Sequence, residues 1–433
     1  MFQVGSAEEI LRVPLFAELY GYGPFHGRRN IGVHDLLYCR AFFFRDDNGG
    51  RAMIIYSDVC TMPDSYAREM REKISQTTGI SPDCIALVAT HTHSGPCLGN
   101  GGIGWGEPDQ TFQENWKHLV PELALKAVVS AENIRCVETG KAELSGKLGY
   151  NRVEPEKNIT DDTIRWARFL REDGSCKLLL HNLGLHGTTM NGEYAALVSS
   201  DWMGVVNRMI VDEKLAEMSL YLQGASGDVN PNTTCGDLQN DQGAEVVASR
   251  YVKDLKKSLS EGGKKITDLA IRGILRTMEF PVVVQTTEEL KRDEAAYREI
   301  RKYHADRLRE MCILRELGHD FRSFHDLQVI RIGGLSFFFI PGEYFVEDGN
   351  ALMKRSGGEN CFIATVANGN GAYYPSAADM KRYPDIASYH RCQDKHAFGF
   401  YEIYGYPCRH TFKYQDHIAA FVADNLITLE ELI

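Results

Sequence analysis

Short apolar runs and amphipathic stretches alternate along most of this 433-residue chain, and this alternation constrains the fold more than any other feature of the sequence. Apolar runs of about 4–8 residues predict buried strands, whereas apolar positions three or four residues apart predict helices that pack on a sheet. We therefore expect an α/β fold, with a mixed β-sheet flanked by helices. The expected strands cover residues 40–44, 52–57, 84–90, 177–185, 219–224, 327–332, 336–340 and 361–367, and the expected helices cover residues 65–77, 112–131, 201–213, 243–259 and 416–428.

The one shift in composition lies between Thr286 and Leu317, where charged residues dominate. Thr286 or Thr287 can cap a helix there, and the apolar residues of the segment form a rough stripe. The segment predicts one long, mostly solvated helix inserted between strands, with a packing arm or a dimer contact as the alternative. Since the sequence holds no internal repeat and no low-complexity linker, we expect a single domain over residues 1–433 with a helical insertion at about 286–320.

The charge balance and the hydropathy of the chain exclude several classes of protein. Acidic residues outnumber basic ones by 59 to 48, giving a formal net charge of −11, whereas a nucleic-acid binder needs a basic face. No apolar run approaches the ~18–20 residues that span a bilayer, so we expect no membrane span. The first residues show no charged start followed by an apolar core, so we expect no secretory signal.

The 11 cysteines are scattered through apolar stretches, and none forms a CxxC pair. Such an arrangement is typical of reduced, buried thiols, and we therefore expect a cytoplasmic protein. These features leave the oligomeric state open, with a homo-oligomer as one alternative.

The sharpest local motif is THTHSGP at residues 90–96, directly after an expected strand. Because alternate residues of a strand share a face, we expect His91 and His93 to point to the same side. Two imidazoles side by side at a strand end can bind a metal ion or transfer protons. The alternative is structural, with both histidines hydrogen-bonded in a packed strand end.

Other expected strands also run into small residues that carry one polar group. His186, Asn230, Glu343 and Tyr374 each follow such a strand closely. Open α/β sheets place their ligands beyond the carboxyl ends of the strands, so we expect these residues to line one crevice. Each of these segments taken alone also fits ordinary turn chemistry.

The order of these motifs resembles that of the neutral/alkaline (non-lysosomal) ceramidases and their shorter relatives. The resemblance covers roughly residues 21–404, and it implies the α/β fold of the N-terminal catalytic domain of a neutral ceramidase. It rests on GVHDLLYCRAFFF at 32–44, Ser57-Asp58, THTHSGP at 90–96, HGTTM at 186–190, GDVNPN at 227–232, PGE at 341–343 and the Tyr-Pro-Ser segment at 374–376.

The resemblance implies a single zinc ion (Zn2+). The ligands of the family fall on His91, His186, Glu343 and Tyr374 of this sequence, with the neighbouring Tyr373 as the alternative phenol. Two imidazoles, a carboxylate and a phenolate suit zinc, which is a borderline ion.

The resemblance also implies roles for residues beyond the metal ligands. His93 then either supports the metal ligands from outside or carries a proton, and Arg152 matches an Asn-Arg motif that lines the pocket of the family. Tyr401 resembles a second pocket tyrosine. Asp228 is either an orienting carboxylate or a structural cap in a Gly-Asp turn.

Two departures from the family pattern bear on the substrate. Ceramidases have a serine after the GDV motif, whereas this chain has Asn230, whose amide cannot act as a nucleophile. The amide can donate a hydrogen bond to a substrate carbonyl or to an oxyanion. The chain also ends at Ile433 without room for the C-terminal immunoglobulin-like domain of ceramidases. Both departures speak against ceramide, so the expected substrate is a small soluble N-acyl compound or an N-acylated sugar.

We therefore expect a zinc-dependent amidohydrolase that cleaves an N-acyl amide bond with zinc-activated water. His93 is expected to take the proton of that water and return it to the leaving amine, while Arg152 or Tyr374 holds the oxyanion.

Three other interpretations stay open. A zinc esterase or lactonase of the same fold would use the same chemistry. A non-catalytic ligand-binding homologue is motivated by Asn230, although the four competent metal ligands argue against it. An HxH amidohydrolase barrel is an alternative fold, but the sequence shows no convincing set of the bridging Lys and late-strand Asp that it needs.

Overall fold

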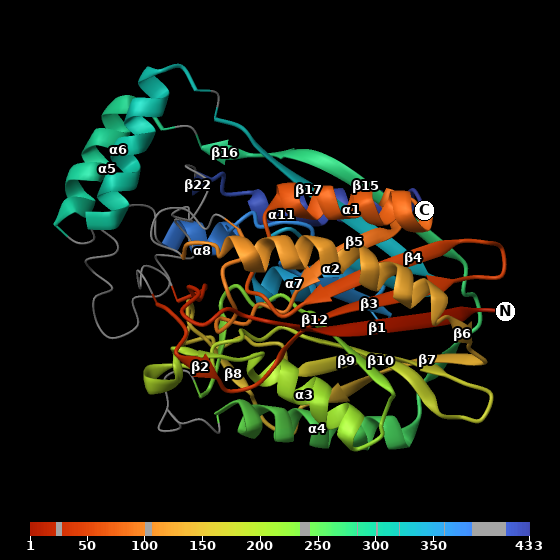
Figure 1. Cartoon of the computed structure of the whole chain (residues 1–433). Helices are drawn as coiled ribbons and strands as arrows, with labels where there is room; N and C mark the ends of the chain where they lie inside the picture. The colour runs from red at the N-terminus through yellow and green to blue at the C-terminus, as the bar shows by residue number, and fades with distance from the viewer. Residues whose placement is uncertain are drawn as a thin grey trace.

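A computed structural model gives the fold of the chain and describes residues 1–22, 28–99, 106–233, 243–283, 285–299, 302–319, 321–358, 360–382 and 413–433. Its centre consists of two five-stranded mixed sheets that lie between two pairs of helices (Figure 1). The expected α/β class with mixed strand directions is confirmed, although the strands divide among several sheets.

The first sheet has the strand order β5-β4-β3-β1-β6, and within it only β4 and β5 run parallel. Apolar residues dominate β4 and β5, which are buried along nearly their whole length, as expected for strands covered on both faces. Helix α2 packs on β1 and β3, and helix α1 packs on β5. The elements of this layer are β1 (Gln3–Leu11), β3 (Leu37–Arg45), β4 (Arg51–Ser57), β5 (Ile85–Ala89), β6 (Glu132–Asn133), α1 (Asp64–Thr78) and α2 (Gln110–Val129).

The second sheet has the order β12-β10-β9-β7-β14, with β10 and β12 parallel and the other pairs antiparallel. Phe169 of this sheet joins the two layers. The centroid of its ring lies 5.5 Å from that of Phe44 and 6.2 Å from that of Phe2. The elements of this layer are β7 (Cys136–Glu143), β9 (Thr163–Leu170), β10 (Cys176–Leu183), β12 (Met218–Gln223), β14 (Lys264–Ile266), α3 (Asp201–Asp212) and α4 (Gly243–Glu261).

A third, four-stranded sheet has the order β15-β17-β18-β20. The Asn182 side chain of β10 joins it to the second sheet by donating hydrogen bonds of 2.8 Å to the carbonyls of Leu222 and Ile363. Leu87 of β5 donates to the Asn368 side chain at 3.0 Å, so the carboxyl ends of β5, β12 and β20 meet. The elements are β15 (Ile271–Phe280), β17 (Ser323–Ile332), β18 (Leu335–Phe339), β20 (Cys361–Ala364), α7 (Val346–Arg355) and α11 (Ile418–Glu431).

Four short strand pairs hold the segments that connect these sheets. They fix loops that would otherwise have few hydrogen bonds, and two of them carry residues of the candidate site. The pairs are β2 (Gly32–Val33) with β11 (Leu197–Val198), β8 (Gly149–Asn151) with β13 (Val229–Pro231), β16 (Val282–Val283) with β22 (Lys413–Tyr414), and β19 (Glu343–Tyr344) with β21 (Tyr373–Tyr374); 3-10 turns at Pro82–Cys84 and Gly192–Tyr194 and the short helix α8 (Ala377–Arg382) complete the described elements.

The charged insertion forms two helices, and the prediction of one long helix is wrong. Helices α5 (Thr287–Arg298) and α6 (Lys302–Glu316) lie side by side and project from the body of the molecule (Figure 1). The predicted cap is confirmed, since Thr286 and Glu289 form a capping box. The two helices bury Tyr297 and Leu308, which a single solvated helix would leave in water.

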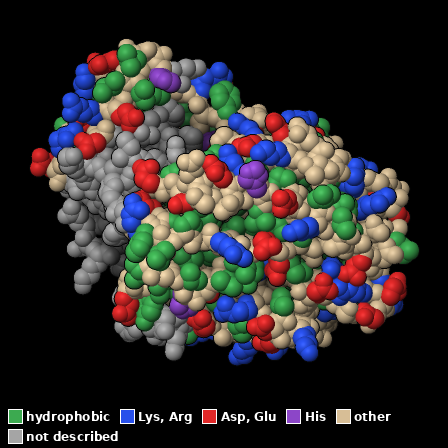
Figure 2. All heavy atoms as spheres, viewed as in Figure 1, with side chains coloured by type: hydrophobic (Ala, Val, Ile, Leu, Met, Phe, Trp, Pro, Cys, Tyr) green, Lys and Arg blue, Asp and Glu red, His purple; other side chains and the backbone are tan. Residues whose placement is uncertain are grey.

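The described surface carries mixed charge. On the face shown in Figure 2, Lys and Arg side chains are interspersed with Asp and Glu. Among the described helices, none has the length and apolarity required to cross a membrane.

The packing of Phe169 predicts how strongly the two central sheets stabilise each other. Phe169→Ala should lower the free energy of unfolding by about 3–5 kcal/mol, because a fully buried ring leaves a cavity between the layers. Urea denaturation followed by circular dichroism measures this loss. Phe324→Ala is the control, since Phe324 is 42% exposed. An equal loss for both variants would contradict the central position of Phe169.

Candidate metal centre

The loops that follow the strands β5, β10, β12 and β18 lie against one another at one end of the sheets. The His93 backbone N–H donates to the Gly187 carbonyl at 3.0 Å, and Thr92 forms a parallel bridge with Gly187. Gly187 is required by this approach, because a Cβ there would lie 2.6 Å from the His91 carbonyl oxygen. The Gly227 N–H donates to the Tyr344 carbonyl at 3.0 Å. The predicted meeting of strand ends is therefore present.

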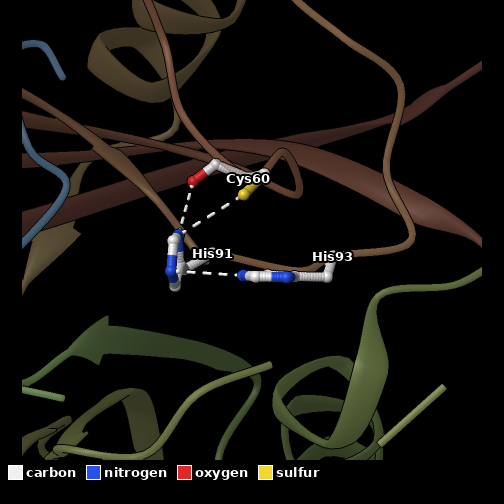
Figure 3. A group of neighbouring side chains, drawn as sticks. All are labelled: Cys60, His91 and His93. Carbon is white, nitrogen blue, oxygen red and sulfur yellow. Dashed lines mark hydrogen bonds between the residues drawn. The ribbon is translucent and has the colours of Figure 1, made fainter. Parts of the chain in front are cut away.

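A turn, and not a strand, brings His91 and His93 together. Strand β5 ends at Ala89, and His91 has a left-handed φ of +66°. The two rings stand nearly perpendicular, at 89°, with centroids 4.8 Å apart (Figure 3). The expectation of two imidazoles side by side is met, but the alternation of a strand is not its cause.

Backbone carbonyls orient the rings of His91 and His186. The Nδ1 atom of His91 donates to the Cys60 carbonyl at 2.9 Å, and that of His186 donates to the Ser226 carbonyl at 2.6 Å. A carbonyl oxygen can only accept, so Nδ1 carries a proton in both rings and Nε2 is the nitrogen turned to the site. Such carbonyl contacts are typical of histidines that bind metals.

The Nε2 atoms of His91 and His186 converge on one carboxylate oxygen. Glu343 Oε2 lies 3.3 Å from the first and 3.0 Å from the second. It nevertheless has no partner in hydrogen-bond geometry among the described residues. Three buried donor atoms within 4.8 Å of one another, one of them lacking a hydrogen bond, fit a metal ion.

Cys60 with His91 and His93 forms a second group of ligand types, and Figure 3 shows its arrangement. The Cys60 thiol lies 3.5 Å from Nδ1 of His91, whereas His93 Nε2 lies 3.3 Å from Nε2 of the same ring. A metal between all three would have to bind His91 from two sides. Since Nδ1 is already bonded to a carbonyl, the group of His91, His186 and Glu343 fits an ion better.

The charges of the site are coupled. Burial opposes ionisation of Glu343, but His91 and His186 hold the pKa of its carboxyl well below the usual value. Burial also opposes protonation of His91, but Cys60 and Glu343 raise its pKa well above the usual value. Burial, assisted by the Arg152 charge, lowers the pKa of His186 to about 4. The imidazole of His91 and the carboxylate of Glu343 therefore favour each other's charged form.

Tyr373, and not Tyr374, faces this group. In the parallel pair of β19 and β21, Glu343 lies opposite Tyr373, so these two residues share a face and Tyr374 points to the other. The Tyr374 hydroxyl donates to the Pro341 carbonyl at 2.9 Å, and its ring packs on Phe280. The structure therefore corrects the assignment of Tyr374 and brings the alternative tyrosine to the site.

Arg152 connects Tyr373 to His186. One guanidinium nitrogen, Nη2, lies 2.7 Å from the Gly227 carbonyl, 3.2 Å from the Tyr373 hydroxyl and 3.5 Å from His186 Nε2. Arg152 is only 8% exposed, so its charge acts on the site with little screening by water. The structure thus places this predicted pocket residue beside the group.

Asp228 has a structural role. Its carboxylate accepts from the backbone N–H of Val346, at the start of α7, and from the Asn151 side chain at 2.7 Å. Burial raises the pKa of Asp228 to about 7. The carboxylate therefore caps a helix and holds the segment that carries Arg152, which supports the structural one of the two predicted roles.

Tyr22 and Arg28 also contact His93. The Tyr22 ring meets its edge at 5.2 Å, and Arg28 donates to its carbonyl at 2.6 Å. Burial, together with the neighbouring imidazoles of His91 and His186, lowers the pKa of His93 well below the usual value. The lowered pKa favours the neutral form of the His93 imidazole.

Asn230 is buried on β13, next to the residue whose carbonyl accepts from the His186 backbone. Its amide nitrogen lies 3.5 Å from the Tyr150 hydroxyl, and its Oδ1 has no partner among the described residues. No described contact joins Asn230 to the group of His91, His186 and Glu343. Tyr401 lies outside the described residues.

Sequence reasoning missed Cys60, Ser226 and Tyr22. The first two contribute a backbone carbonyl, which any residue type supplies, so their identity carried no signal. Tyr22 lies inside the region of resemblance but outside every motif.

Comparison with known proteins finds relatives that carry the name neutral ceramidase. No protein-family model matches the chain. Neutral ceramidase A of Dictyostelium discoideum is 25% identical over 247 residues, covering 49% of this chain and 34% of that protein. Neutral ceramidase B of the same organism is 25% identical over 233 residues, covering 48% and 32%. Each match thus spans about a third of the length of the relative.

Solved structures show the same likeness at the level of the fold. The crystal structure of neutral ceramidase from Pseudomonas aeruginosa superposes with a TM-score of 0.75 at 14% identity, covering 99% of this chain and 74% of that chain. A ceramidase complexed with C2 gives a TM-score of 0.70 with the same identity and coverage. The chain therefore has a ceramidase-like α/β fold. The resemblance predicted from the motifs is confirmed, and the chain is a distant relative of the neutral ceramidases.

The coupling between Glu343 and His91 generates a test. Glu343→Gln should lower the pKa of His91 in protein treated with a chelator, because the carboxylate that favours its charged form is removed. Nuclear magnetic resonance titration of labelled histidine rings measures this pKa. His181, whose pKa is lowered to about 3 by burial, serves as the internal control and should not change. An unaltered His91 pKa would refute the coupling.

Proposed function

We propose that the chain is a zinc-dependent hydrolase that cleaves the amide bond of a small soluble N-acyl substrate. The observation that carries the proposal is the convergence of His91 Nε2 and His186 Nε2 on Glu343 Oε2. Tyr373 completes the proposed ligand set, because it shares a face with Glu343 and contacts Arg152.

The residue types favour zinc over other ions. Two imidazoles with one carboxylate are a common protein ligand set of catalytic zinc, whereas magnesium and calcium prefer oxygen ligands alone. When bound, zinc supplies Lewis-acid chemistry, which polarises a carbonyl oxygen and makes a water acidic.

The side chains around this centre are suited to the remaining tasks of amide hydrolysis. His93 is neutral and stands 3.3 Å from His91, so it can accept the proton of an attacking water and return it to the leaving nitrogen. Arg152 holds a buried positive charge beside Tyr373, where it can stabilise the developing oxyanion. Asn230 lacks a nucleophilic atom, which favours direct attack by water over a covalent acyl-enzyme.

The proposed substrate class rests on the names of the relatives and on one residue in which this chain differs from the family pattern. The relatives carry the name ceramidase, and ceramide is an N-acyl compound, so an amide substrate is the first candidate. Ceramide itself is disfavoured by Asn230 in place of the family serine. An ester or lactone is the second candidate, since the same residues serve both bonds. We also propose a cytoplasmic location, on the basis of the scattered cysteines of the sequence.

Metal content tests the centre directly. We expect about one zinc ion per chain after reconstitution, and we expect His186→Ala to lose it, since an imidazole ligand is removed. Elemental analysis of the purified protein measures both. His181→Ala is the matched control, because His181 is equally buried on β10, the strand that precedes His186, but is bonded to Tyr251 and Asn207. A zinc-free native protein would favour the binding-homologue interpretation.

The role of His93 predicts a loss of rate without a loss of metal. His93→Gln should lower kcat on an N-acyl substrate by about 10²–10⁴-fold, because the proton acceptor is gone. Release of the free amine across a panel of N-acyl compounds measures the rate, and zinc content checks the centre. A variant with native kcat would exclude His93 as the base, and a variant without zinc would make it a ligand.

A further inference from the structure

A buried hydrogen-bond chain joins α1 to β17. Asp64, the first residue of α1, accepts from His325 Nδ1 at 2.7 Å, and the Ser323 hydroxyl lies 2.8 Å from His325 Nε2. These contacts have the order of a Ser-His-Asp triad. Ser323 and His325 are only 2% and 1% exposed, however, so a substrate does not reach the serine. The chain of contacts needs a different explanation.

Asp64 and Tyr414 bond to the backbone of the loop between β20 and β21. Asp64 accepts from the Asn370 backbone N–H at 3.2 Å with its second oxygen. Tyr414 of β22 donates to the Gly371 carbonyl at 2.7 Å, and its hydroxyl oxygen lies 3.3 Å from His325 Nε2. Asp64 and Tyr414, which are far apart in the sequence, thus hold two consecutive residues of one loop, and His325 contacts both of them.

Several residues of this loop have backbone conformations that are unfavourable without support from outside the loop. Val366, Asn368 and Ala372 have φ values of +48°, +61° and +63°. Left-handed conformations are costly for residues with a Cβ, and most of all for a β-branched valine. Such strain persists only where surrounding contacts over-determine the conformation. The bonds from Asp64 and Tyr414 are contacts of this kind.

The loop leads directly into the candidate metal centre. Its last residue, Ala372, accepts a hydrogen bond from the Glu343 backbone N–H at 2.8 Å. The next residue is Tyr373, which pairs with Glu343 in the short sheet of β19 and β21. A displacement of the loop would therefore shift the carboxylate and the phenol of the site together.

We propose that Asp64, His325 and Tyr414 are positioning residues that hold the loop of residues 366–372 and thereby set Glu343 and Tyr373 for metal binding. The part of this inference that concerns the metal rests on the proposed zinc centre. The part that concerns the loop rests on contacts of Asp64, His325 and Tyr414, which are not among the proposed zinc ligands.

Tyr414→Phe tests the inference with the loss of one hydroxyl. Tyr251→Phe is the matched control, because the Tyr251 hydroxyl is also buried and lies 2.8 Å from a histidine, His181 Nδ1, in the second sheet layer. Hydrogen–deuterium exchange of residues 366–373 in zinc-stripped full-length protein measures the loop. Zinc titration against a competing chelator measures the affinity of the same proteins.

We expect Tyr414→Phe to speed exchange in the loop and to raise the zinc Kd by about tenfold, a usual cost of removing an outer support of a metal ligand. Tyr251→Phe should alter neither quantity. Native exchange in Tyr414→Phe would overturn the inference whether or not the protein binds zinc. Faster exchange with native zinc affinity would overturn the link to the centre, as would equal weakening by both variants. Failure of the unaltered protein to bind zinc would instead overturn the proposed function.

Discussion

The buried charge of Glu343 is the interaction on which the rest of the site depends. Removing a carboxylate from water costs several kcal/mol unless opposite charge lies close by. His91, whose pKa the carboxylate raises, supplies that compensation at 3.3 Å, and the His186 Nε2 atom lies 3.0 Å from the same oxygen. The Cys60 carbonyl holds His91, and the carbonyls of Ser226 and Val229 hold His186. The charge is therefore balanced only when the loops after β5, β10, β12 and β18 have closed on one another.

The packing of the sheets supplies free energy that stabilises this closed arrangement of loops. The first and second sheets share a continuous apolar core, and rings such as Phe44 and Phe169 lock them face to face. Against that frame the site contains non-glycine residues in left-handed conformations, among them His91 at +66°. Each such residue costs about 1–3 kcal/mol, which the surrounding packing has to offset. Such residues also occur away from the site, for example Phe16 and Lys214, but His91 shows that the site itself contains one.

The likeness to neutral ceramidases is one of fold more than of sequence. It extends over 99% of the chain at only 14% identity with the solved structure, which is expected when buried apolar positions tolerate substitution as long as their pattern and volume persist. Function belongs to the site and not to the fold. The proposed hydrolytic chemistry therefore rests on the residue types at His91, His186 and Glu343, and the proposal of a direct attack by water rests on Asn230.

The sequence by itself determined the apolar strands and the amphipathic helices, because their burial follows from a regular period. All eight expected strands and all five expected helices outside the insertion are present. It missed strands such as β7, CVETGKAE, where only alternate residues are buried and the polar residues hide the pattern. It also gave the insertion as one helix, since no Gly or Pro marks a break between Thr286 and Leu317.

For the site, the sequence determined which residue types stand at the strand ends, because local motifs carry that information. Only the tertiary structure decided how they meet. The left-handed turn at His91, the choice of Tyr373 over Tyr374 and the carbonyl contacts of Cys60 and Ser226 depend on backbone directions set by partners far away in the chain. The pairing of β19 with β21 fixes which of two adjacent tyrosines faces Glu343, and no local pattern in a Tyr-Tyr pair distinguishes the two faces of a strand.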